Sequence, residues 1–224
     1  MGKETSLSAA AVQGAIQPRF GEVKIRNRGR LPHWEKEAGL YFITFHLADS
    51  LPQGALDKIV ERHRMLEVAE RSGMKLLPSQ EVLVAEYSPK RIDGYFDRGY
   101  GACSLHDPRI AELTADALLF WHGKRYRMVA WCIMPNHVHV ICSMLPGNEL
   151  AKVVRSWKSY TSRMANQILG RHGKFWQREY YDRLIRDGEE FDRAVEYVLS
   201  NPERAGLKDW QWVWSAGLET GATS

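Results

Sequence analysis

The pattern of apolar and polar positions predicts strands and helices that alternate along most of the chain. Continuous runs of apolar and β-branched residues predict strands at residues 40–47, 126–134 and 137–144. Apolar residues spaced three and four apart predict helices at residues 52–73, 108–123, 148–169 and 187–201. Residues 74–107 fit neither pattern, and residues 174–185 are expected to be extended. This order predicts an α+β fold, in which an antiparallel sheet has its helices packed on one face.

Several helix ends carry specific residue signals. Asp107 and Pro108 suit the N-cap and the first position of the helix that follows them. Asp187 and Glu190 form the pattern of a capping box at the start of the last helix. We expect that helix to end at Asn201-Pro202, because a residue before proline avoids the helical conformation.

Length and composition indicate one domain with extensions. A chain of 224 residues is long enough for one well-packed domain and short for two. We expect a basic, flexible arm over residues 1–36, a folded domain over residues 37–207 and a tail over residues 208–224. No apolar run is long enough to span a membrane and the first residues show no leader pattern, so we expect a cytoplasmic protein.

Positive charge is concentrated in two segments, although the net charge is only +4. Residues 1–36 contain seven Lys and Arg against three acidic residues, and residues 148–186 contain nine against three. This distribution predicts contact with a nucleic acid, and a solvated charged surface is the alternative. The candidate nucleic-acid-binding residues are Arg28, Arg30, His33, Trp34, Lys152, Arg155, Lys158, Arg163, Lys174, Trp176 and Arg178.

Two histidines stand one residue apart in the second strand of the predicted hairpin. His137 and His139 project from the same face of an extended segment, because strand side chains alternate between faces. Such a pair can bind one metal ion. Two half-buried strand histidines that bind nothing would give the same pattern.

The last helix offers polar residues away from its apolar stripe. Tyr197 and Asn201 are four residues apart and therefore share one face of the helix. A tyrosine hydroxyl can act as a nucleophile, and Tyr160 competes with Tyr197 as the candidate for that role. Tyr160 lies at the edge of its own helix's apolar stripe, and no potential metal ligand follows it four residues later. The sequence alone leaves a structural role open for each tyrosine.

Four motifs in a fixed order resemble those of the REP-associated tyrosine transposases, which belong to the wider family of HUH single-tyrosine transposases. The motifs are MPNHVH at 134–139, SWKSY at 156–160, WQR at 176–178 and YVLSNP at 197–202. The resemblance extends over about residues 28–207 and implies a ferredoxin-like domain that cleaves and rejoins single-stranded DNA at short palindromic repeats.

The resemblance also implies roles for individual residues. His137 and His139 correspond to the two metal-binding histidines, Tyr197 to the nucleophile that forms a 5′-phosphotyrosine, and Asn201 to a third metal ligand on the same helix. Some relatives have glutamine at that last position, and its side chain is longer than that of Asn201. The expected cofactor is a divalent ion, Mg²⁺ or Mn²⁺, and the expected partner is single-stranded or hairpin DNA, bound by a monomer or a homodimer.

Two other functions share part of this pattern. A histidine-triad nucleotide hydrolase also has alternating histidines on a strand, but it would need a third histidine where this chain has Ile141. A non-catalytic protein that binds hairpin or single-stranded DNA could retain the same fold, and the residues alone do not report turnover.

Overall fold

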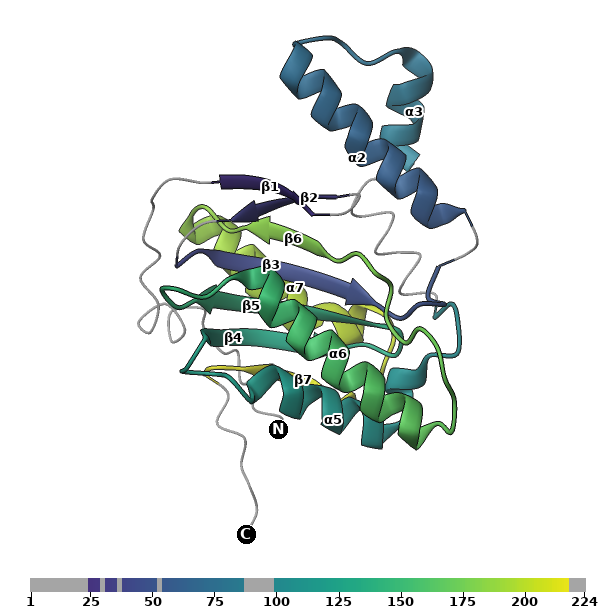
Figure 1. Cartoon of the computed structure of the whole chain (residues 1–224), viewed down its shortest axis with the longest axis vertical. Helices are drawn as coiled ribbons and strands as arrows, with labels where there is room; N and C mark the ends of the chain where they lie inside the picture. Colours follow the sequence, from purple (N-terminus) through teal and green to yellow (C-terminus); the bar gives the residue numbers. More distant parts are fainter. Residues whose placement is uncertain (1–23, 29–30, 36–37, 52–53, 87–98, 218–224) are drawn as a thin grey trace, which may run out of the picture.

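A five-stranded antiparallel sheet forms the centre of the protein (Figure 1). The computed structural model describes residues 24–28, 31–35, 38–51, 54–86 and 99–217. The strands are β3 (Leu40–His46), β4 (Tyr126–Ile133), β5 (His137–Met144), β6 (Tyr181–Leu184) and β7 (Val213–Ser215), in the spatial order β6-β3-β5-β4-β7.

The first four of these strands, with two helices, have the ferredoxin-like topology. Along the chain the elements run β3, α5 (Pro108–Leu119), β4, β5, α6 (Leu150–Ile168) and β6. This is a strand-helix-strand unit repeated twice, with the two halves interleaved so that β3 and β5 lie in the middle. The predicted α+β class and antiparallel sheet are confirmed.

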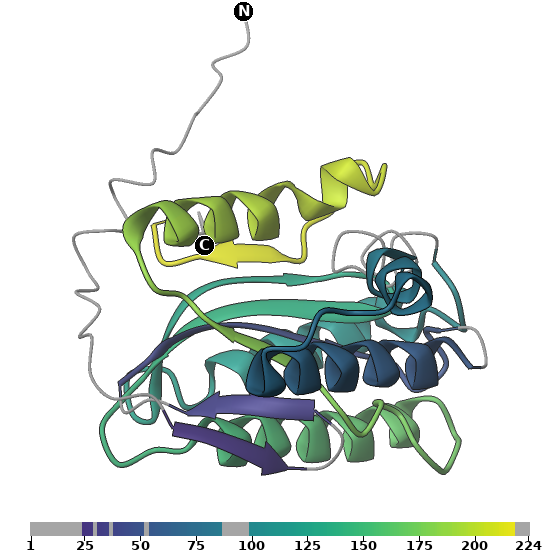
Figure 2. The same cartoon turned by 90° about the horizontal axis from the view of Figure 1, so that it is seen from above.

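Helices cover both faces of the sheet, which differs from the expected packing on one face. Figure 2 shows α6 on one side and α7 (Gly188–Arg204) on the other. Successive strand residues point to opposite faces of the sheet, and each face has its own apolar core. Val138 and Val140 pack on the α6 side, and Ile141 packs on the α7 side. The unbroken apolar runs of β4 and β5 reflect this burial on both faces.

Residue signals at the helix starts form the expected caps, whereas the end of the last helix differs. Asp107 Oδ1 accepts a hydrogen bond from the backbone N–H of Arg109 at 3.0 Å, and Asp187 Oδ1 accepts one from Glu190 at 2.7 Å. The predicted stop at Asn201-Pro202 is wrong, because α7 continues through Pro202 to Arg204. Proline removes a single N–H donor, and the backbone bonds from Ala205 to Asn201 (3.0 Å) and from Leu207 to Pro202 (2.8 Å) maintain the last turn.

The insertion after β3 forms a helical hairpin that extends away from the sheet (Figure 1). It consists of α2 (Ala55–Ser72) and α3 (Pro78–Glu86). Within the predicted apolar stripe of α2, Ile59 is buried but Val68 is 55% exposed, so this stripe contributes little to the main core. The previously unassigned region also contains the short helix η1 (Ser104–His106), and residues 87–98 lie outside the described part.

Both terminal segments contribute strands. β1 (Lys24–Arg28) and β2 (Leu31–Glu35) form an antiparallel hairpin beside β6, within the segment expected to be a flexible arm. Residues 210–215 of the expected tail are also part of the fold, because β7 pairs with β4 and Trp210 Nε1 donates to the Ile133 carbonyl at 2.8 Å. None of the described helices is both long and apolar enough to cross a membrane.

Candidate functional site

The two histidines of β5 lie together on the face of the sheet that α7 covers. His137 and His139 are each 1% exposed, and their Nε2 atoms are 3.0 Å apart. Their register partners on β3 are His46 and Thr44, whose side chains therefore lie on the same face. The alternation predicted from the sequence thus brings both ring nitrogens to one point.

Hydrogen bonds fix the other nitrogen of each imidazole. His137 Nδ1 lies 2.7 Å from Asn136 Oδ1, and His139 Nδ1 lies 2.9 Å from Thr44 Oγ1. Asn136 in turn donates from Nδ2 to the Tyr100 carbonyl at 3.2 Å. Each ring is thus held at its Nδ1 atom, and the two Nε2 atoms face each other.

Burial keeps these imidazoles neutral. It lowers the pKa of His139 to about 3. The pKa of His137 is also well below its usual value, first because of burial and then because of the neighbouring His139 and His46. Neutral imidazole is the form that ligates a metal, so neither ring has to lose a net proton at neutral pH.

The last helix places Tyr197 against His139. Their rings meet edge to face with centroids 5.3 Å apart, and Phe42 packs against both rings. Asn201 follows one helical turn later and is 2% exposed. Its Oδ1 is buried and has no hydrogen-bond partner among the described residues. A buried oxygen without a protein partner is commonly met by a water molecule or an ion.

These residues fit a divalent ion. Two nitrogen ligands that each lie about 2.1 Å from one ion at a right angle are about 3.0 Å apart, as the two Nε2 atoms are. Within the described ranges, no group of three or more His, Cys, Asp or Glu side chains could hold a metal. An ion here would therefore need a neutral oxygen as its third protein ligand, and Asn201 Oδ1 is the candidate.

The structure separates the two candidate tyrosines. Tyr160 lies on α6, whose core residues pack on the sheet face opposite to the histidines, and it is 43% exposed. Tyr197 is the one that the fold brings to His139.

Two neighbours of the candidate site residues were not found from the sequence, one beside Tyr197 and one beside His137. The guanidinium carbon of Arg204 lies 5.2 Å from the centroid of the Tyr197 ring. The spacing of seven residues could have indicated it, but the predicted helix stopped before position 204. His46, whose ring centroid is 5.7 Å from that of His137, could be placed only once the register of β3 and β5 was known.

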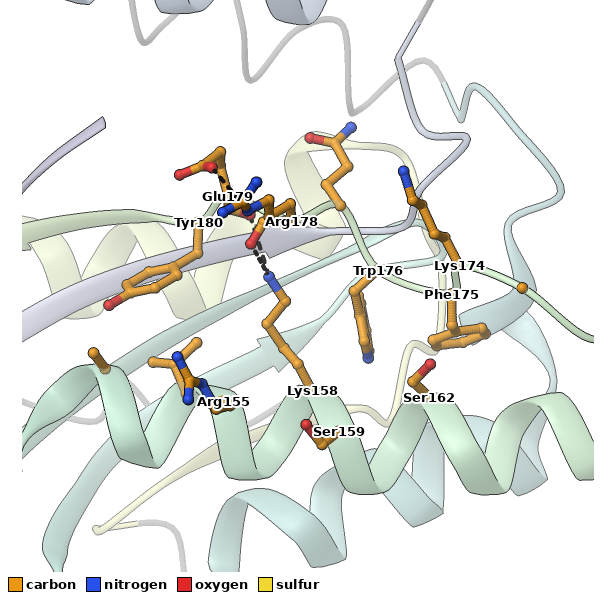
Figure 3. Close-up of a pocket in the computed structure, with 14 residues that line it drawn as sticks. Arg155, Lys158, Ser159, Ser162, Lys174, Phe175, Trp176, Arg178, Glu179 and Tyr180 are labelled. Carbon is orange, nitrogen blue, oxygen red and sulfur yellow. Dashed lines mark hydrogen bonds and ion pairs between the residues drawn. The ribbon is translucent and has the colours of Figure 1, made fainter. Parts of the chain in front are cut away.

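A basic groove lies on the α6 side of the sheet. It has a volume of about 720 Å³ and runs between α6 and residues 173–180, with Arg155, Lys158, Lys174 and Arg178 in its lining (Figure 3). Lys158 reaches across it and donates to the carbonyls of Arg178 at 2.9 Å and Glu179 at 3.3 Å. Burial lowers the pKa of this lysine to about 8. Lys158 therefore stabilises the wall of the groove, while the other three cations are exposed.

Other candidate DNA-binding residues lie in the core, elsewhere on α6, or in β1 and β2. Trp176 lines the groove, but most of its side chain is buried in the core: it is 6% exposed, packs edge to face on Phe45 and donates to Thr161 Oγ1 at 2.8 Å. Lys152 pairs with Glu149 at 2.9 Å and, like the exposed Arg163, does not line the groove. The backbones of Arg28, His33 and Trp34 lie in β1 and β2, and the side chains of these residues and the whole of Arg30 lie outside the described part.

Comparison with known proteins finds similarity to transposases. A family model described as "Transposase IS200 like" matches residues 118–201, which include both histidines, Tyr197 and Asn201. A protein of Haemophilus influenzae named for the REP-associated tyrosine transposases is 26% identical over 102 residues, which cover 39% of this chain and 57% of that protein. The chain thus spans little more than half the length of this relative.

Two solved structures are also similar at low sequence identity. A structure described as a REP-associated tyrosine transposase bound to a REP hairpin aligns with 81% of this chain and 79% of its own, at 17% identity and a TM-score of 0.43. A protein of Deinococcus radiodurans described as a transposase aligns with 83% of this chain and 97% of its own, at 13% identity and a TM-score of 0.31.

Proposed function

This chain is related to the IS200-like and REP-associated tyrosine transposases, and we propose that it is a metal-dependent endonuclease and transposase of single-stranded DNA. In this proposal it cleaves and rejoins DNA at short palindromic repeats through a 5′-phosphotyrosine. The observation that carries the proposal is the contact between Tyr197 on α7 and His139 on β5, which joins a nucleophile to a pair of metal-ligand side chains.

In the cleavage step, the Tyr197 hydroxyl oxygen attacks a backbone phosphorus. A new oxygen-phosphorus bond forms on the tyrosine, the bond to the 3′ oxygen breaks, and the departing 3′ oxygen takes up a proton while the phenol loses one. Presenting a phenolate at pH 7 costs about 4 kcal/mol for a phenol with a pKa of about 10. Arg204 lies over the ring and favours the negative charge as it develops.

Strand transfer is the reverse reaction with another 3′ hydroxyl. That hydroxyl attacks the phosphotyrosine, and Tyr197 leaves with its oxygen. The covalent intermediate conserves the energy of the broken ester, so no nucleotide cofactor is needed.

His137, His139 and Asn201 would hold the divalent ion, Mg²⁺ or Mn²⁺. When bound, such an ion neutralises charge on the non-bridging phosphate oxygens and polarises phosphorus. Imidazole ligands suit Mn²⁺ better than Mg²⁺, which prefers oxygen. The orphan amide oxygen of Asn201 and the converging Nε2 atoms are what support this assignment.

The basic groove is the proposed contact for the DNA backbone. Its exposed cations, Arg155, Lys174 and Arg178, can neutralise phosphates and release their counterions. The solved relative described as bound to a REP hairpin suggests a hairpin as the form of DNA. The groove and the histidines lie on opposite faces of the sheet, so DNA could bind in the groove without being cleaved. A non-catalytic DNA-binding protein is therefore the second candidate.

An adduct assay separates the two functions. The protein is incubated with single-stranded repeat DNA and Mn²⁺, and a denaturing gel reports a covalent complex. We expect an adduct that EDTA prevents and that Tyr197→Phe abolishes, whereas the matched variant Tyr160→Phe retains it. Tight binding without an adduct in Mn²⁺ or Mg²⁺ would reject the enzyme, and an adduct that survives in Tyr197→Phe would reject the nucleophile.

A further inference from the structure

We infer that Asn136 and Thr44 are positioning residues that control the tautomers of the two site histidines. Asn136 presets His137 for metal ligation, whereas the Thr44 hydroxyl allows His139 to exchange its tautomer when an ion binds. The inference rests on the proposed metal site, but its first part concerns the metal-free protein alone.

The orientation of the Asn136 amide follows from its contacts with Tyr100 and His137. Its Nδ2 faces the Tyr100 carbonyl at 3.2 Å, and a carbonyl oxygen accepts hydrogen bonds but does not donate them. The NH₂ group must therefore be on that side, which leaves Oδ1 to face His137 Nδ1 at 2.7 Å. An amide oxygen only accepts, so His137 carries its proton on Nδ1. Its Nε2 then carries no proton and presents a lone pair towards His139 Nε2.

A clamped loop presents the Tyr100 carbonyl. Asp49 Oδ2 accepts a hydrogen bond from the backbone N–H of Ala102 at 2.8 Å. Gly101 has a φ of +88°, and a Cβ at this residue would come within 2.5 Å of the Asp49 carbonyl oxygen. The chain can pass so close to Asp49 only because residue 101 is glycine. This loop belongs to the stretch that the sequence pattern left unassigned, and it anchors the Tyr100 carbonyl, which accepts the last hydrogen bond of the chain.

The tautomer of His139 follows from that of His137. The two Nε2 atoms are 3.0 Å apart, and His137 Nε2 has only a lone pair to offer. His139 must donate from its own Nε2 for this contact to be a hydrogen bond. Its Nδ1 then carries a lone pair and accepts from the Thr44 hydroxyl at 2.9 Å. In the metal-free protein the donors thus run in one direction, from Thr44 through His139 and His137 and then from Asn136 to Tyr100.

An ion held by both histidines would require His139 to change its tautomer. His139 Nε2 would give up its proton to water and Nδ1 would take one from water, so the ring would remain neutral. The new Nδ1–H needs an acceptor, and the Thr44 oxygen provides one after its hydroxyl rotates. A hydroxyl can serve as donor in the first state and as acceptor in the second, which a valine or a backbone N–H cannot do.

Nitrogen-15 NMR of the histidine rings tests the metal-free part. In EDTA, we expect the His137 ring to show Nδ1–H and the His139 ring to show Nε2–H. With the diamagnetic probe Cd²⁺, His139 should convert to Nδ1–H and His137 should keep its tautomer. Nε2–H on His137 in the metal-free protein would overturn the inference whether or not the protein binds an ion.

Thr44 substitutions test the exchange. Thr44→Val should lower Mn²⁺ affinity, measured by titration calorimetry, by about 10- to 100-fold. Thr44→Ser should restore it, and Thr114→Val, which removes an equally buried hydroxyl from α5, should leave it unchanged. Equal affinity in the wild type and Thr44→Val would refute the role of Thr44. A wild type that binds no ion, with the expected tautomers in EDTA, would instead refute the metal site and leave the assignment of Asn136 intact.

Discussion

Acid should destabilise this protein through its buried histidines. The pKa of His139 is lowered to about 3 by burial, whereas in the unfolded chain it returns to about 6.5. Between these two values the unfolded state binds a proton that the folded state does not bind. The stabilisation is therefore fully present above pH 6.5 and is lost progressively as pH falls towards 3.

The magnitude follows from the same two values. Each pH unit below 6.5 costs about 1.4 kcal/mol per histidine, so His139 alone should remove about 2 kcal/mol at about pH 5. The pKa values of His137 and His46 are also lowered, first by burial and then by the neighbouring His139, so both residues add to the loss in the same direction. A loss of this size is a substantial part of the 5–15 kcal/mol that typically stabilises a domain.

Urea unfolding in EDTA at a series of pH values, from about 7.5 to about 5, measures this slope. His139→Gln should reduce the loss of unfolding free energy over this interval by about 2 kcal/mol, whatever its effect at pH 7.5. His172→Gln, at an exposed position on the loop after α6, should follow the wild type. Parallel curves for the wild type and His139→Gln would refute the reasoning that His139 is buried in its neutral form.

Three further predictions concern the groove, the nucleophile and the core. Arg155→Gln should weaken DNA binding and reduce the slope of log K against log salt by about 1, whereas Lys152→Gln, outside the groove, should change neither; equal slopes would mean that the groove does not meet phosphates. Arg204→Gln should lower the rate of adduct formation by a larger factor than it lowers DNA affinity, and Arg204→Lys should recover part of that rate. An unchanged rate would mean that Arg204 does not act in the cleavage step. Tyr126→Phe should cost about 1–3 kcal/mol in urea unfolding because Trp157 Nε1 loses its buried acceptor, and a neutral effect would contradict that bond.

Local pattern was sufficient for much of the site. Alternation along a strand placed His137 and His139 on one face, and a spacing of four placed Tyr197 and Asn201 together on a helix. The resemblance to REP-associated tyrosine transposases, drawn from four short motifs, is confirmed by the matches to related sequences. These features depend only on residues that are close in the sequence.

The features that sequence did not reveal depend on tertiary packing. Thr44 meets His139 through a strand register between segments 95 residues apart, and no local signal specifies that register. Trp176, an aromatic between basic residues, was expected to contact DNA, and no local signal showed that most of its ring is buried or that Thr161 accepts from its indole N–H. The continuous apolar runs of β4 and β5 are typical of strands buried on both faces, but all the helices were expected on one face of the sheet.

The short strand β7 protects the sheet from self-association. It pairs with β4 through Val213, Trp214 and Ser215, and Trp214 stacks on Trp131 with ring centroids 6.5 Å apart. The family match ends at residue 201, before this strand. A protein truncated at that boundary would expose the backbone donors and acceptors of β4 as an open apolar edge, which is a template for aggregation. Expression of the domain should therefore extend at least through Ser215.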